Sequence, residues 1–178
     1  MNTAYKLQGI HRHYEWGGQS FIPQLMHIDN ATSKPFAEYW MGAHPSAPSI
    51  VETPEGAVAL DQMITENTIQ FLGAKTTDRF GSLPYLFKIL DVEKMLSIQV
   101  HPSKENAEKG FNKEQIAGLP IDAPHRNYKD QNHKPEVMVA LSDFWLLHGF
   151  MPAIALKERL TSLAPLQNLL PIFGMDDY

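Results

Sequence analysis

The stretch from residue 84 to residue 101 constrains the fold of this 178-residue chain more than any other. Residues 84–92 (PYLFKILDV) are almost continuously apolar, as expected of a strand that is buried on both faces. Residues 96–101 (LSIQVH) alternate strictly, so a strand there would have one aliphatic face and one polar face. The polar face would carry Ser97, Gln99 and His101. We therefore expect β structure near the centre of the fold.

The segments around this stretch predict a mixture of short strands and short helices. We expect strands at residues 37–42, 48–51 and 135–141, and one or two helices over residues 58–72 that stop at Gly73. Residues 103–118 predict two helical turns, ended by Gly110 and Gly118. Residues 119–135 are expected to form a polar loop.

The character of the sequence changes at about residue 150. Pro152 can begin a helix, and aliphatic residues follow it at roughly helical spacing until Pro165 interrupts them. We therefore expect residues 1–150 to form a β-rich domain and residues 151–178 to begin an α-helical region.

Composition excludes several classes of protein. The chain is 43% hydrophobic and 20% charged, which is typical of a globular protein. Its 15 basic and 20 acidic residues give a net charge of −5, which argues against general nucleic-acid binding. It contains no apolar run of about 20 residues and no apolar secretion signal at its start, so we expect a cytoplasmic protein that spans no membrane.

A metal site is the first chemical hypothesis. Without cysteine, a metal must be held by histidine, carboxylate or amide oxygen. Gln99 and His101 would lie about 6–7 Å apart on one strand face, where their side chains can converge on one ion. Glu136 begins the strand predicted at residues 135–141, and it shares a face with apolar residues, which is costly for an unpaired carboxylate. These three residues could form an open zinc site, or hold Mn, Fe or Co. The alternatives are a polar strand face that meets water and a surface carboxylate.

Two lysines are candidates for other roles. Lys88 lies inside the apolar run and could hold a phosphate together with Ser97, or extend to the surface. Lys134, close to Glu136, could carry a proton, or be a solvated loop residue. Trp16 and Trp40 are most simply core or wall residues.

Several segments of the chain resemble a known family. The segments LSIQVHP (96–102) and NYKDQNHKPE (127–136) look like signature segments of type I mannose-6-phosphate isomerases. Shorter matches occur at YEWG (14–17), AEYWMGAHP (37–45) and LPYLFK (83–88). The resemblance extends over most of the chain up to about residue 150.

This resemblance implies a fold, a reaction and a set of site residues. The fold would be mainly β with an α insertion: an incomplete portion of a cupin-type (jelly-roll-like) β-barrel, followed by the start of a helical domain. The reaction would interconvert mannose 6-phosphate and fructose 6-phosphate through an enediol, with one Zn²⁺ per chain. The implied metal ligands are Gln99, His101 and Glu136, and Lys134 would handle the proton. The implied substrate-binding residues are Ser97, Lys88, Trp16 and Glu38.

The chain also departs from that family. Members are more than twice as long, and they carry a fourth ligand, a histidine, and a substrate-binding arginine further along. An incomplete barrel would expose strand edges and apolar surface. The alternative is therefore a truncated, non-catalytic cupin module that binds a metal or a sugar phosphate, and a fragment without a stable fold is a third possibility.

Overall fold

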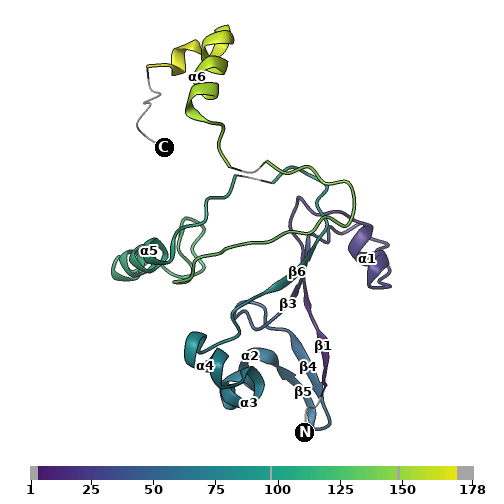
Figure 1. Cartoon of the computed structure of the whole chain (residues 1–178). Coiled ribbons are helices and arrows are strands. Elements are labelled where there is room, and N and C mark those ends of the chain that lie inside the picture. Colours follow the sequence, from purple (N-terminus) through teal and green to yellow (C-terminus); the bar gives the residue numbers. More distant parts are fainter. Residues whose placement is uncertain (1–3, 97, 148, 172–178) are drawn as a thin grey trace. The chain divides into compact units, whose positions relative to one another are not determined.

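A computed structural model describes residues 4–96, 98–147 and 149–171 (Figure 1). Contacts within the chain divide it into two compact units, Met1–Val100 and His101–Tyr178. The domain boundary expected near residue 150 stays a prediction. In the described part of the chain, no helix is both long enough and apolar enough to cross a membrane.

The first unit contains two antiparallel three-stranded sheets. The strands of one sheet follow the order β1-β4-β5, and those of the other follow the order β2-β3-β6. The strands are β1 (Lys6–Gln8), β2 (Ile10–Arg12), β3 (Glu38–Met41), β4 (Ile50–Thr53), β5 (Gly56–Ala59) and β6 (Phe87–Leu90). The strands predicted at residues 37–42 and 48–51 correspond to β3 and β4. The apolar run of residues 84–92 supplies β6, which lies at the edge of its sheet. Its residues are half-buried or exposed, so the strand is not buried on both faces as we expected.

Four short helices complete the first unit. They are α1 (Phe21–Leu25), α2 (Leu60–Glu66), α3 (Thr68–Leu72) and α4 (Ala74–Phe80). The side chain of Asn67 accepts a hydrogen bond from the backbone N–H of Gln70 and so caps α3. Gly73, at a φ of 75°, ends that helix. The helices predicted over residues 58–72 are therefore confirmed as α2 and α3, with their predicted stop.

The two faces of the β2-β3-β6 sheet differ in character. Tyr39 on β3 packs with Ile22 and Phe36 in a small hydrophobic core. Its hydroxyl accepts a hydrogen bond from the backbone N–H of Gly9 at 2.7 Å. Because side chains alternate along a strand, the neighbours of Tyr39 on β3, Glu38 and Trp40, face the opposite side.

The longest helix of the second unit is α5 (Lys104–Ile116). This unit also contains α6 (Ala153–Ser162) and a 3-10 helix, η1 (Ala164–Leu169). Ser103 caps α5 by accepting from the backbone N–H of Asn106 at 3.3 Å, and Gly118, at a φ of 71°, follows its C-terminus. The predicted stop at Gly110 is wrong, because α5 continues through it. A Cβ atom at Gly110 would lie 2.5 Å from ring carbons of Tyr128, so this glycine permits a close packing contact.

Two predicted strands are absent from the residues described. Residues 98–101 and 135–141 belong to no strand. Ile98 and Val100 are 91% and 78% exposed, and Val137 and Val139 are also largely exposed. A strand forms only when another strand satisfies its backbone hydrogen bonds, and no described segment pairs with either stretch. The described residues accordingly form two open sheets and no closed barrel.

Candidate functional site

His101 and Glu136 lie together in the second unit. The Nε2 atom of His101 is 3.5 Å from the Oε2 atom of Glu136, and both side chains are partly exposed. Ligand atoms at zinc distances of about 2.1 Å and tetrahedral angles lie about 3.4 Å apart. The observed distance therefore fits two ligands of one ion, and a nitrogen and a carboxylate oxygen are donors that zinc accepts.

The described residues of the second unit form only part of the predicted metal site. Gln99 is exposed and belongs to the first unit, close to the boundary. Within the described ranges, no group of three or more His, Cys, Asp or Glu side chains is placed to hold a metal ion. The pair His101–Glu136 is thus the part of the predicted ligand set that the structure brings together.

Lys134 is held by a carboxylate that sequence reasoning did not identify. Its Nζ atom lies 3.0 Å and 3.2 Å from the two carboxylate oxygens of Asp130. Asp130 also accepts a hydrogen bond from the backbone N–H of Asn132 at 2.8 Å. Lys134 is therefore paired with a carboxylate, although its side chain stays 46% exposed.

Lys88 and Glu38 form a second cluster, on the polar face of the β2-β3-β6 sheet. Glu38 is only 8% exposed, and its Oε1 atom lies 3.8 Å from the Nζ atom of Lys88. Trp40 pairs with Lys88 across β3 and β6. The Trp40 indole N–H donates to Oε2 of Glu38 at 2.6 Å, and the Lys88 ammonium lies 4.8 Å from the centre of the Trp40 ring. Lys88 therefore has a buried carboxylate partner and does not simply extend to solvent.

Aromatic and basic side chains from the first strands extend this cluster. The Arg12 guanidinium lies 5.1 Å from the centre of the Trp40 ring, and its Nε–H donates to the hydroxyl of Tyr14 at 3.1 Å. Trp16 stacks on Tyr14, with ring centres 5.6 Å apart. Trp16 is half-buried, so part of its indole stays accessible to a ligand. Ser97, the remaining predicted substrate residue, lies outside the described residues.

Sequence reasoning missed the two residues that orient these clusters, Trp40 and Asp130. Trp40 was assigned to the core or wall, although its spacing of two from Glu38 in a predicted strand already placed both side chains on one face. Asp130 stands four positions before Lys134, and only the folded loop brings their charged groups together.

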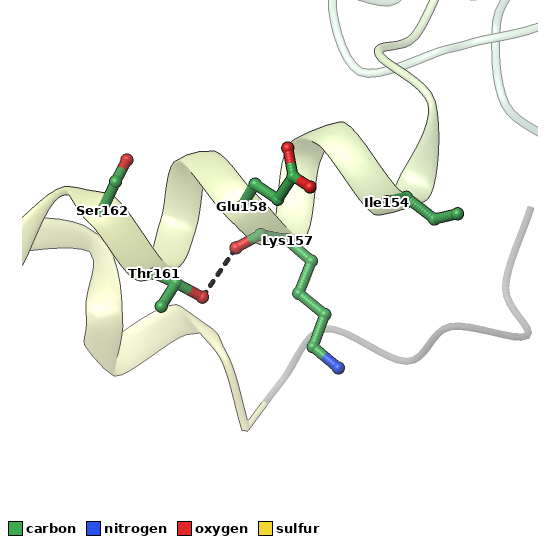
Figure 2. Close-up of a pocket in the computed structure, with 5 residues that line it drawn as sticks. All are labelled: Ile154, Lys157, Glu158, Thr161 and Ser162. Carbon is green, nitrogen blue, oxygen red and sulfur yellow. Dashed lines mark hydrogen bonds between the residues drawn. The ribbon is translucent and has the colours of Figure 1, made fainter.

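A surface hollow on α6 does not belong to either cluster. Figure 2 shows the five side chains that line it, with the Thr161 hydroxyl donating to the backbone oxygen of Lys157 at 2.8 Å. All of the lining residues come from one helix, so the hollow is the side of a helix and not an enclosed cavity. They are Ile154, Lys157, Glu158, Thr161 and Ser162.

Comparisons with known proteins agree on one family. The family described as "Phosphomannose isomerase type I, catalytic domain" matches residues 4–153. Mannose-6-phosphate isomerase from Salmonella typhimurium is 47% identical over 146 residues, which are 82% of this chain and 37% of that protein. The corresponding protein of Escherichia coli is 46% identical over the same coverage. This chain therefore spans little more than a third of the length of these relatives.

A solved structure supports the same relationship. The crystal structure of mannose 6-phosphate isomerase from Salmonella typhimurium, bound to substrate and a zinc atom, matches with a TM-score of 0.67. The match has 47% sequence identity and covers 73% of this chain and 33% of the other.

Proposed function

The chain belongs to the type I phosphomannose isomerase family, and from this membership we propose that it carries part of the active site of a mannose-6-phosphate isomerase. The proposed reaction is the zinc-dependent interconversion of mannose 6-phosphate and fructose 6-phosphate through an enediol. The observation that carries the proposal is the 3.5 Å approach of His101 to Glu136, in a chain of this family.

His101 and Glu136 would hold the zinc ion together with Gln99. Zinc supplies electrophilic assistance in this chemistry by polarising sugar oxygens. The three residues contribute one nitrogen and two oxygens and no thiolate, a donor set that suits a catalytic zinc with an open position.

Lys134 would move a proton during the reaction. Conversion of the aldose to the ketose removes the proton at C2, beside the C1 carbonyl, and adds a proton at C1. A side-chain amine can perform both transfers if it is held near the two carbons and can exchange its own proton. The two carboxylate oxygens of Asp130, at 3.0 Å and 3.2 Å from Nζ, hold the Lys134 amino group in place.

The cluster on the β2-β3-β6 sheet would bind the sugar phosphate. Lys88, with Ser97, is proposed to bind the phosphate, because an ammonium and a hydroxyl both donate to phosphate oxygens. Glu38 holds the Lys88 ammonium from one side, at 3.8 Å. The accessible part of the Trp16 indole would pack against the sugar ring. Together these residues would orient the substrate without taking part in proton transfer.

We further propose that the chain forms an incomplete portion of a cupin-type barrel. Two observations support this: residues 96–101 alternate between apolar and polar side chains, and the apolar Ile98 and Val100 are exposed. Residues 135–141 are likewise apolar and largely exposed at Val137 and Val139. Both segments would become barrel strands when paired.

The proposed activity is tested by assaying the purified chain, with added zinc, for conversion of mannose 6-phosphate to fructose 6-phosphate. Turnover that is lost in Glu136→Ala, and kept in Glu105→Ala, is the expected result. Glu105 is a suitable control because it is an exposed α5 residue that pairs with Lys109. Turnover that survives Glu136→Ala would refute the proposed site. Zinc binding without turnover would instead favour the non-catalytic binding module.

A further inference from the structure

The segment of residues 126–132 has no helix or strand, yet hydrogen bonds attach it along α5. Near the C-terminal end of the helix, the Glu114 carboxylate accepts from two consecutive backbone amides, the second being that of Tyr128 at 2.8 Å. Near the N-terminal end, the Lys104 ammonium donates to the backbone oxygen of Gln131 at 2.9 Å and to the side chain of the next residue at 3.3 Å. The segment therefore runs antiparallel to α5 and is fixed at both ends.

Arg126 fastens the beginning of this segment. Its side chain is fully buried, and its Nε atom donates to the backbone oxygen of Tyr128 at 2.8 Å and lies 3.7 Å from the Glu114 carboxylate. Its Nη1 atom donates to the side-chain oxygen of Gln115 at 2.9 Å and to the backbone oxygen of Leu119. A buried charge is costly unless it is paired, and the Glu114 carboxylate and these oxygens supply the partners of Arg126.

Two further features keep the segment close to the helix. The missing Cβ at Gly110 leaves room for the Tyr128 ring, as described above. Burial acts to raise the pKa of Glu114, but the backbone N–H bonds from Tyr128 and Asn127 and the charge of Arg126 outweigh it, so the pKa lies below its usual value. Glu114 therefore remains a carboxylate at neutral pH and keeps both amide bonds.

The two facing side chains of the candidate metal site both stand near the N-terminal end of α5. His101 lies just before Ser103, the residue that caps α5. Glu136 lies just after the segment that α5 holds. Their 3.5 Å separation is therefore fixed by a helix and by a segment attached to that helix at several points.

We infer that Arg126 and Lys104 are positioning residues for the zinc site, because they hold the 126–132 segment on α5 and thereby set the distance between His101 and Glu136. This inference rests on the proposed function, since it takes His101 and Glu136 to be metal ligands. Outer contacts that orient metal ligands typically change metal affinity by about 10–100-fold when they are removed.

The test compares two lysines of α5, of which Lys104 contacts the 126–132 segment and Lys109 does not. Lys104→Met removes the contacts with the segment and an ion pair with Glu108 at 3.2 Å. Lys109→Met removes an exposed ion pair with Glu105 and no contact with the segment. Arg126→Lys keeps the charge but removes the planar group that reaches several oxygens at once. Co²⁺ titrations of the full chain, followed by visible absorption, give both the Kd and the spectrum of the bound metal.

We expect a Co²⁺ Kd at least about tenfold higher for both Arg126→Lys and Lys104→Met. Both variants should also have an altered spectrum at saturation, whereas Lys109→Met should match the wild-type chain. If circular dichroism shows that Arg126→Lys does not fold, the comparison of Lys104→Met with Lys109→Met tests the inference. Wild-type Kd and spectrum in folded Lys104→Met would overturn this inference alone. A wild-type chain that binds no Co²⁺ would overturn the proposed metal site and, with it, this inference.

Discussion

The bond between Glu38 and Trp40 should make a large and measurable contribution to the stability of the first unit. The carboxylate is 8% exposed and accepts from the indole N–H at 2.6 Å. A hydrogen bond to a charged group contributes about 1.5–3 kcal/mol, and leaving a buried donor without a partner costs about 1–3 kcal/mol. The Lys88 ammonium, at 3.8 Å and partly exposed, adds less than about 1 kcal/mol. We therefore expect Glu38→Ala to lower the free energy of unfolding by about 2–4 kcal/mol.

A double-mutant cycle separates this bond from other effects of each substitution. Glu38→Ala, Trp40→Phe and the double variant are unfolded in urea and followed by far-ultraviolet circular dichroism. We expect a coupling energy of about 1.5–3 kcal/mol between the two positions. The control is Glu52→Ala, which removes an exposed ion pair with Lys6 on the other sheet and should cost less than about 1 kcal/mol. A coupling energy below about 0.5 kcal/mol would show that the carboxylate is not held by the indole.

Three further substitutions test other parts of the structure. Gly110→Ala should lower the stability of α5, because the new methyl group would meet the Tyr128 ring. This contact should outweigh the preference of about 1 kcal/mol that alanine has over glycine in a helix. A higher melting temperature of the variant would contradict the contact. Tyr39→Phe should lower the free energy of unfolding by about 1–3 kcal/mol, because it leaves the buried N–H of Gly9 without its partner. Urea unfolding at neutral pH measures the loss, and an unchanged midpoint would contradict the prediction. Burial holds the pKa of His11 below its usual 6.5, so the unfolded chain binds the proton first as the pH falls. Stability should therefore decrease below about pH 6.5, and it should decrease less in His11→Phe. Equal pH dependence in the two chains would argue against a lowered pKa of the half-buried His11.

Local sequence patterns correctly predicted two helices of the first unit and the glycines that end two helices. The glycines at 73 and 118 end helices because a positive φ suits glycine, and α2 and α3 follow the apolar spacing. The same logic failed at Gly110, where poor helix propensity predicted a stop. The contact with Tyr128 that explains this glycine joins residues far apart in the sequence, and no local pattern reports it.

The alternating stretch at residues 96–101 shows a different limit. Alternation indicates which face a strand would bury, but a strand also needs a neighbour to satisfy its backbone. No described segment provides that neighbour, so Ile98 and Val100 remain exposed.

The close approach of His101 and Glu136 agrees with the sequence-based hypothesis, whereas the residues that hold the pair in place were not predicted. Spacing, the absence of cysteine and the resemblance to a family pointed to His101 and Glu136. Arg126 lies in a stretch that looked like an ordinary polar loop, because its role depends on oxygens supplied by α5 and by residues that follow the helix.

The zinc site is tested most directly by measuring bound zinc per chain after equilibrium dialysis, in the wild-type chain and in single alanine variants. We expect one zinc per wild-type chain, and little or none in Glu136→Ala or His101→Ala. His133→Ala should keep the metal, because this exposed histidine lies near Glu136 in the sequence but is not among the proposed ligands. Zinc that remains bound in Glu136→Ala, or that is lost in His133→Ala alone, would contradict the proposed ligand set.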